Sequence, residues 1–157
     1  MKYLETFENH KYDITQKLSD IKLLQDDELF GWYNPDSNQV FTKGKMSYPK
    51  KPSDSGNWYL FHTHPIGESG KPSEIDIMSA IEKGNEDPLY ILSSEGLYKF
   101  QLPNNKAAKE KLHKLYKRYG VKDFDDFYEK HGNDEIPDEL DRKDFHKYIG
   151  VIITLLK

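Results

Sequence analysis

The chain has 157 residues, a formal net charge of −4 at pH 7 and no cysteine. This length is most simply one domain with a single core, and the acidic balance gives no overall basic surface for nucleic acid. Without cysteine there is no disulfide framework, no thiolate zinc site and no cysteine nucleophile, so any metal must be held by His, Asp or Glu.

The N-terminal part of the chain is predicted to begin as helix and continue as a β-hairpin. Apolar residues at partly helical spacing in 3–24 predict one or two short helices. Residues 29–33 and 39–42 are typical of strands, and 34–38 between them of a turn. Residues 43–57, with prolines, glycines and lysines, predict an irregular connection that contains a short strand near Met46.

A histidine pair follows the apolar, aromatic run that starts at Trp58. Side chains alternate faces along a strand, so His62 and His64 leave the same side. Ser73 is a good N-cap, which places Asp76 in the first turn of the next helix, able to face back to the strand. Two imidazoles and a carboxylate are a ligand set of catalytic zinc sites, with the fourth position left to water. The sequence therefore predicts Zn²⁺ held by His62, His64 and Asp76.

Each part of this motif also has an ordinary structural interpretation. A pair of histidines can lie satisfied at a sheet edge. Ser73 and Asp76 can form a capping box and nothing more. The combination of two histidines on one face, a loop with Gly67 and Gly70, and a carboxylate in the first helical turn favours the metal site.

The rest of the chain predicts one helix, a second hairpin and further helices. The helix from Glu74 is expected to end near Gly84, and strands are expected at 89–92 and 97–102. Helices are predicted at 106–119, at 123–131 and from Pro137 to the end of the chain. The last of these includes the apolar residues 148–156. His113, His131 and His146 lack the close pairing of His62 and His64, and are interpreted as surface or helix-face residues.

This order of elements predicts a mixed sheet flanked by helices, an α/β or α+β sandwich. We expect a catalytic domain over 1–105 that includes the N-terminal helical segment. A helical extension over 106–157 is expected to pack on the same domain.

His62-Thr63-His64-Pro65 and Ser73-Glu74-Ile75-Asp76 resemble the signature of the JAB1/MPN/Mov34 metalloenzymes, the JAMM or MPN+ family. That signature has a distant Glu, then His-Ser/Thr-His-Pro, a short loop and Ser-x-x-Asp. Pro72-Ser73 is similar to the prokaryotic branch that includes RadC-like proteins, although the loop from His64 to Ser73 is one residue longer than usual. The resemblance stops at Leu102 and implies an MPN/JAB-like fold.

The resemblance also implies an upstream glutamate at the head of a strand, in the pattern Glu-x-x-Gly. Glu28-Leu29-Phe30-Gly31 fits this pattern, which makes Glu28 the candidate catalytic base. Ser73 is the candidate donor to the substrate oxygen, the role that the family assigns to the corresponding serine. The alternative for Glu28 is a solvated residue at the end of the acidic run 26–28.

The activity implied is zinc-dependent hydrolysis of a peptide or isopeptide bond, often at the C-terminal tail of ubiquitin or a ubiquitin-like protein. Such a tail is expected to bind extended, beside a strand edge. The main alternative is a non-catalytic MPN-type scaffold that binds a partner protein. The chain is too short for the barrel of His-x-His phosphoesterases, and it lacks the cysteines of cytidine-type deaminases.

Neither end of the chain predicts export or membrane insertion. Residues 1–22 mix acids and bases without the apolar core of a signal peptide, and 148–156 are too few to span a bilayer. We therefore expect a soluble, cytoplasmic and, from its signature, prokaryotic or phage protein. No nucleic acid or membrane partner is expected.

Overall fold

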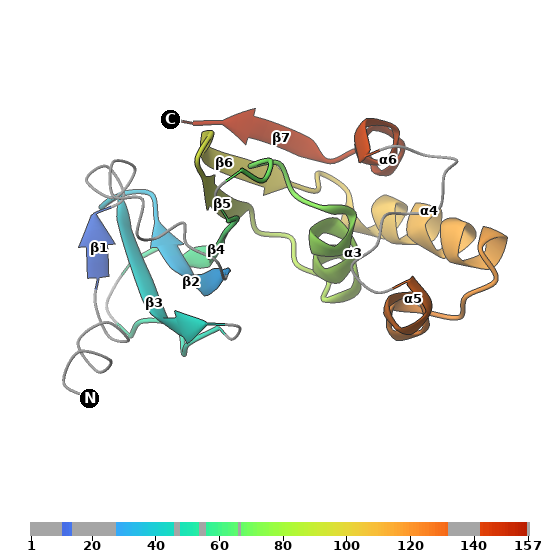
Figure 1. Cartoon of the computed structure of the whole chain (residues 1–157), viewed down its shortest axis with the longest axis horizontal. Coiled ribbons are helices and arrows are strands. Elements are labelled where there is room, and N and C mark those ends of the chain that lie inside the picture. Colours follow the sequence, from blue (N-terminus) through green and yellow to red (C-terminus); the bar gives the residue numbers. More distant parts are fainter. Residues whose placement is uncertain are drawn as a thin grey trace. The chain divides into compact units, whose positions relative to one another are not determined.

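The computed structural model describes residues 11–13, 28–45, 48–53, 56–65, 67–131 and 142–156, and its elements are labelled in Figure 1. The strands form one mixed sheet of seven strands in the order β1-β3-β2-β4-β5-β6-β7, and helices complete an α/β fold as predicted. The elements are β1 (Lys11–Asp13), β2 (Leu29–Asn34), β3 (Gln39–Lys45), β4 (Tyr59–Thr63), α3 (Glu74–Glu82), β5 (Leu89–Ser93), β6 (Gly96–Gln101), α4 (Asn105–Arg118), α5 (Phe124–His131), α6 (Arg142–Ile149) and β7 (Ile152–Leu155).

The chain divides into two compact units. The first takes in 1–71, 88–99 and 154–157, and it holds β1 to β5. The second takes in 72–87 and 100–153, and it holds all the described helices. None of the helices in the described residues has the length and apolar character needed to cross a membrane.

Strand pairing in the first unit begins with the predicted hairpin. Strands β2 and β3 are antiparallel, with Trp32 opposite Phe41, and their register shifts between Leu29 and Gly31. Gly31 is required at this shift because a Cβ there would collide with the carbonyl oxygen of Phe41. Strand β4 then pairs antiparallel with β2 and parallel with β5, so it lies inside the sheet rather than at an edge.

The core of the first unit is built from apolar side chains of these central strands. Its buried members are Leu29, Tyr33, Val40, Phe61, Tyr90, Leu92 and Leu97, with Tyr59 packed against them. Phe61 is fully buried, directly before the histidine pair. The strand that carries the histidines is thus fixed by pairing on both edges and by burial of the preceding aromatic residue.

The second unit packs four amphipathic helices together. α3 contacts α4, α5 and α6, and α4 also contacts α6. The side chains at the centre of this packing are fully buried: Ile77, Ile81, Leu112, Phe127 and Phe145. α3 and α4 are followed by Gly84 and Gly120 with φ values of 65° and 70°, which is the usual glycine stop of a helix. The helices predicted from Glu74 to near Gly84, at 106–119 and at 123–131 are confirmed as α3, α4 and α5.

The structure corrects the prediction for the C-terminal residues. α6 ends at Ile149, and Ile152–Leu155 is strand β7 rather than the end of a helix. Gly150 has φ 85° and its N–H donates to the carbonyl of His146 at 2.9 Å, which ends the helix. The residues that follow are mostly β-branched, and they favour an extended chain.

The structure also corrects part of the N-terminal prediction. Lys11–Asp13 forms strand β1 against β3, where a helix was expected. A segment of three residues is too short for its sequence pattern to distinguish a strand from a helix. Pairing with β3 makes this segment a strand. The rest of the predicted helical segment, the expected strand at Met46 and the helix start at Pro137 lie outside the described residues.

Candidate metal centre

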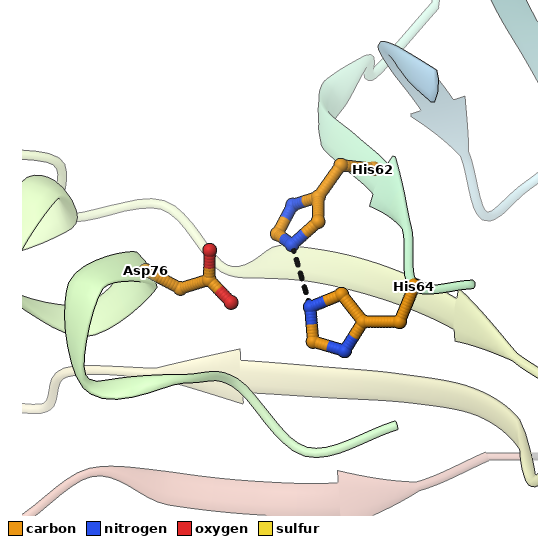
Figure 2. Close-up of side chains that lie close together, drawn as sticks. All are labelled: His62, His64 and Asp76. Atoms are coloured by element: carbon orange, nitrogen blue, oxygen red, sulfur yellow. Dashed lines mark hydrogen bonds between the residues drawn. The ribbon is translucent and has the colours of Figure 1, made fainter. Parts of the chain in front are cut away.

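The two histidines are held at the end of β4 by its neighbours in the sheet. His62 pairs with Phe30 on β2 and with Ile91 on β5, and its ring stacks on that of Phe30 with centroids 5.7 Å apart. His64 lies just beyond the strand, and its N–H donates to the carbonyl of Leu92 at 2.9 Å. Both side chains are buried, with 3% and 4% exposed. Figure 2 shows their rings on the same side of the chain, as the alternation of side chains predicts.

The ring nitrogens of this pair face each other. The Nε2 atoms of His62 and His64 are 3.2 Å apart (Figure 2). With Zn–N bonds of about 2.0–2.1 Å and tetrahedral angles, two nitrogens on one zinc ion are separated by roughly 3.3 Å. The observed separation therefore fits a shared ion. It also fits a direct hydrogen bond from one imidazole to the other, which is how the pair is satisfied when no ion is bound.

The tautomer of His64 is fixed by its second nitrogen. Nδ1 lies 2.6 Å from the carbonyl oxygen of Ser69, and a carbonyl can only accept. Nδ1 therefore carries the proton, and Nε2 presents a lone pair. Metal-binding histidines commonly donate their other N–H to a carbonyl in this way, which orients the ring and raises its basicity.

The carboxylate belongs to a complete capping box at the start of α3. Ser73, the N-cap, has φ −72° and ψ 166°, and its Oγ accepts the N–H of Asp76 at 3.1 Å. In return, Asp76 Oδ2 accepts the N–H of Ser73 at 2.9 Å. The interpretation of Ser73 and Asp76 as a capping box is therefore correct. It does not compete with metal binding, because an ionised carboxylate has four lone-pair sites and this bond uses one.

His62, His64 and Asp76 are the residues in the described part of the chain that form a potential metal-ligand group. One nitrogen of each imidazole and one carboxylate oxygen lie within 4.8 Å of one another, and Figure 2 draws these side chains. The donor set, two ring nitrogens and one carboxylate oxygen, fits Zn²⁺ with a fourth position for water. These are the ligands that the sequence predicts.

Glu28 directly precedes β2, the strand that pairs with β4, which carries His62. Phe30 pairs with His62, and the N–H of Leu29 donates to Thr63 Oγ1 at 2.9 Å. The pairing of β2 with β4 ends at Phe30 and His62, and both Glu28 and His64 lie beyond it. Glu28 is partly buried. Glu28 is not part of the group formed by His62, His64 and Asp76, and its role as a base stays a prediction.

The loop between His64 and Ser73 is held in place by contacts of Gly70 that the sequence analysis did not predict. The N–H of Gly70 donates to Glu95 Oε1 at 2.5 Å, and Gly70 packs so closely on Ser93 and Tyr98 that a Cβ there would collide with both. This fixes the segment whose Ser69 carbonyl orients His64. The sequence analysis named Gly70 only as a loop glycine, and nothing in the local sequence points to Glu95.

The three remaining histidines with a sequence interpretation differ from one another. His113 is exposed on α4, 3.4 Å from a carboxylate oxygen of Glu82, as expected of a helix-face residue. The side chain of His131 lies outside the described residues. His146 is buried, with 9% exposed, and its Nε2 lies 3.0 Å from the carbonyl oxygen of Pro72. His146 lies on helix α6, as one of the two interpretations expected, but the alternative of a surface residue is wrong because tertiary packing buries this helix face.

Comparisons of this chain with protein-family models, with curated proteins and with solved structures found no match.

Proposed function

We propose that this protein is a zinc-dependent hydrolase that cleaves a peptide or isopeptide bond. The observation that carries the proposal is the grouping of His62, His64 and Asp76 as three ligand atoms within 4.8 Å. Zn²⁺ bound there would act as a Lewis acid, lowering the pKa of a bound water towards ~7 and polarising the amide carbonyl. The resemblance of the sequence motifs to the JAMM family supports the same reaction class.

Glu28 is the proposed general base and acid. The sequence motif supports this role, and Glu28 directly precedes strand β2, whose Phe30 pairs with His62. Glu28 takes a proton from the attacking water and gives it to the leaving amine, the usual work of a carboxylate in peptide hydrolysis. Its neighbour Leu29 is tied to Thr63 at 2.9 Å, which fixes the backbone that carries it.

Ser73 is the proposed donor to the carbonyl oxygen of the substrate. Its Oγ already accepts the N–H of Asp76 at 3.1 Å, so its lone pair is oriented and its own O–H is left to donate. A preorganised donor of this kind stabilises the charge that develops on the oxygen as the carbonyl is attacked. Ser69 completes the arrangement by holding the His64 ring through Nδ1.

The proposed substrate is a protein with an extended tail, such as the C-terminal tail of a ubiquitin-like protein. This part of the proposal rests on the sequence resemblance. An extended peptide gains affinity from backbone hydrogen bonds with little reading of its sequence. A prokaryotic or phage setting would make the substrate a protein tag, a precursor or a host protein.

The second candidate is a scaffold that binds a partner and has no catalytic role. The observation in its favour is that the residues are satisfied without an ion, through the contact between the two imidazoles and the capping box of Asp76. Glu28 separates the two functions, because a scaffold has no use for a base at that position.

The test replaces Glu28 with Gln and follows zinc and turnover separately. We expect Glu28→Gln to keep its zinc and to lose turnover by about 10²–10⁴-fold, the usual contribution of a positioned acid or base. Zinc content is measured by elemental analysis. Turnover is measured on a panel of ubiquitin-like fusions, with the cut located by mass spectrometry.

Glu68→Gln is the matched control, because Glu68 is an exposed acid in the loop after His64. It is expected to keep both zinc and turnover. Full turnover by Glu28→Gln, or no cleavage of any fusion by the zinc-loaded wild type, would favour the scaffold.

A further inference from the structure

His146 connects α6 to the chain just before the capping box of α3. Its buried imidazole has Nε2 3.0 Å from the Pro72 carbonyl oxygen, a contact between residues 74 positions apart. Since the carbonyl can only accept, Nε2 carries the proton and donates it. The neighbours of His146 on α6 hold the helix in place: Phe145 is fully buried and Ile149 is buried.

The Pro72 carbonyl and the Ser73 N–H belong to the same peptide group, which is planar and rigid. His146 donates to the oxygen end of this plane at 3.0 Å, while Asp76 Oδ2 accepts from its nitrogen end at 2.9 Å. This plane can turn only about the Pro72 ψ and the Ser73 φ. A donor at the oxygen therefore sets the direction in which the N–H points.

The orientation of this plane decides where the Asp76 carboxylate is held. A hydrogen bond at the oxygen also polarises the amide and strengthens the bond that its N–H donates. The chain of contacts runs from a buried histidine through one rigid amide to the carboxylate. Groups that hydrogen-bond to a metal ligand, directly or through one amide, commonly tune that ligand, and their loss lowers metal affinity or activity.

We infer that His146 is a positioning residue for Asp76, and that α6 thereby contributes to the metal centre without touching it. The consequence for zinc rests on the proposed function, whereas the orientation of the amide plane does not. His146 holds the Pro72–Ser73 amide, the amide holds the carboxylate of Asp76, and this carboxylate would supply an oxygen ligand to the ion.

The experiment compares His146→Gln with His146→Asn, and adds His146→Leu. The amide of Gln reaches about as far as Nε2 of histidine, whereas the amide of Asn stops near the position of Nδ1, and Leu has no donor. Zinc affinity is measured by competition with a chromophoric chelator. Amide hydrogen exchange at Ser73 and Asp76 is measured in metal-free protein, and His113→Asn on the exposed face of α4 is the control.

We expect His146→Asn and His146→Leu to bind zinc roughly 3- to 30-fold more weakly, in line with one hydrogen bond acting on a ligand. The Ser73 amide should exchange faster in the same two variants. His146→Gln and His113→Asn should match the wild type in both measurements. If His146→Leu does not fold, the pair of Gln and Asn variants decides.

Wild-type exchange at Ser73 and wild-type zinc affinity in His146→Asn would overturn the inference. Equal losses in His146→Gln and His146→Asn would also overturn it, since ring volume rather than the donor would then matter. If the wild type binds no zinc, the proposed function fails, and the exchange comparison in metal-free protein still decides whether His146 orients the amide.

Discussion

Helices α3 and α5 begin with the same capping chemistry in different surroundings. At α3 the Ser73 hydroxyl accepts the N–H of Asp76 at 3.1 Å. At α5 Asp123 Oδ1 accepts the N–H of Asp126 at 2.8 Å, the same spacing of N-cap and third residue. Each third residue is an aspartate whose carboxylate returns to the chain before the helix, at 2.9 Å from the N–H of Ser73 or of Lys122.

The two carboxylates differ in their partners. Asp126 lies 3.3 Å from the ammonium group of Lys130, and the N–H of Lys122 is the largest of the contacts that lower the pKa of Asp126. Asp76 is grouped with two imidazoles instead. The comparison teaches that capping only places and orients a carboxylate. A lysine beside the carboxylate makes an ion pair, whereas a pair of histidines beside it forms the proposed metal site.

The largest effect is expected when each of these aspartates is replaced by asparagine. The amide keeps an oxygen for the cap and loses the charge that a metal needs. Asp76→Asn should weaken zinc binding by more than about 100-fold, because even outer partners of metal ligands contribute 10–100-fold. Asp126→Asn should leave zinc affinity unchanged. Chelator competition measures both, and equal zinc affinity in the two variants would show that Asp76 is a capping residue alone.

The N-cap residues sharpen the comparison at the level of turnover. Ser73→Ala and Asp123→Ala each remove a cap and should each lower the free energy of unfolding by about 0.5–2 kcal/mol in urea titrations. Ser73→Ala should in addition reduce kcat by about 10²-fold with zinc retained, the loss typical of a missing donor to the substrate oxygen. A Ser73→Ala variant with wild-type kcat would remove Ser73 from the catalytic group.

A glycine stands three residues before each N-cap, and the two have different reasons to be glycine. Gly70 has no room for a Cβ beside Ser93 and Tyr98, whereas Gly120 has open space and a φ of 70°. Gly120→Ala should therefore cost about 1–2 kcal/mol of stability through backbone strain alone. Gly70→Ala should cost about 1–3 kcal/mol through overpacking and should also weaken zinc binding by roughly 3- to 10-fold, because its loop orients His64.

Stability by urea unfolding and zinc affinity by competition distinguish these two glycine variants. The contrast fails if Gly120→Ala alters zinc affinity as much as Gly70→Ala does. It also fails if Gly70→Ala is as stable and binds zinc as tightly as the wild type.

Much of the fold followed from local patterns in the sequence. The turn residues at 34–38 and the helix signals around α3 gave correct elements, since they reflect backbone preferences that act within a few residues. The end of the chain misled because Ile149, Ile152 and Leu156 repeat at helical spacing, although Gly150 between them ends the helix. At this position the helix-ending glycine, Gly150, had more influence than the helical spacing of the apolar residues.

The candidate site likewise has parts that local sequence patterns predicted and parts that they could not predict. Alternation along a strand brought His62 and His64 to one face, and capping chemistry placed Asp76 in the first turn. The supports from His146 and Glu95 could not be predicted, because they join residues 74 and 25 positions apart and no local pattern marks them. Their positions depend on how the helices and the hairpin pack.

Zinc-edge X-ray absorption on the zinc-loaded wild type is the most direct test of the metal centre. The geometry predicts one zinc ion per chain with two imidazole nitrogens and oxygen donors at about 2.0–2.1 Å. The spectrum of Asp76→Asn should lose this signature. A wild-type protein that retains no stoichiometric zinc, or a spectrum with fewer than two imidazoles, would contradict the account.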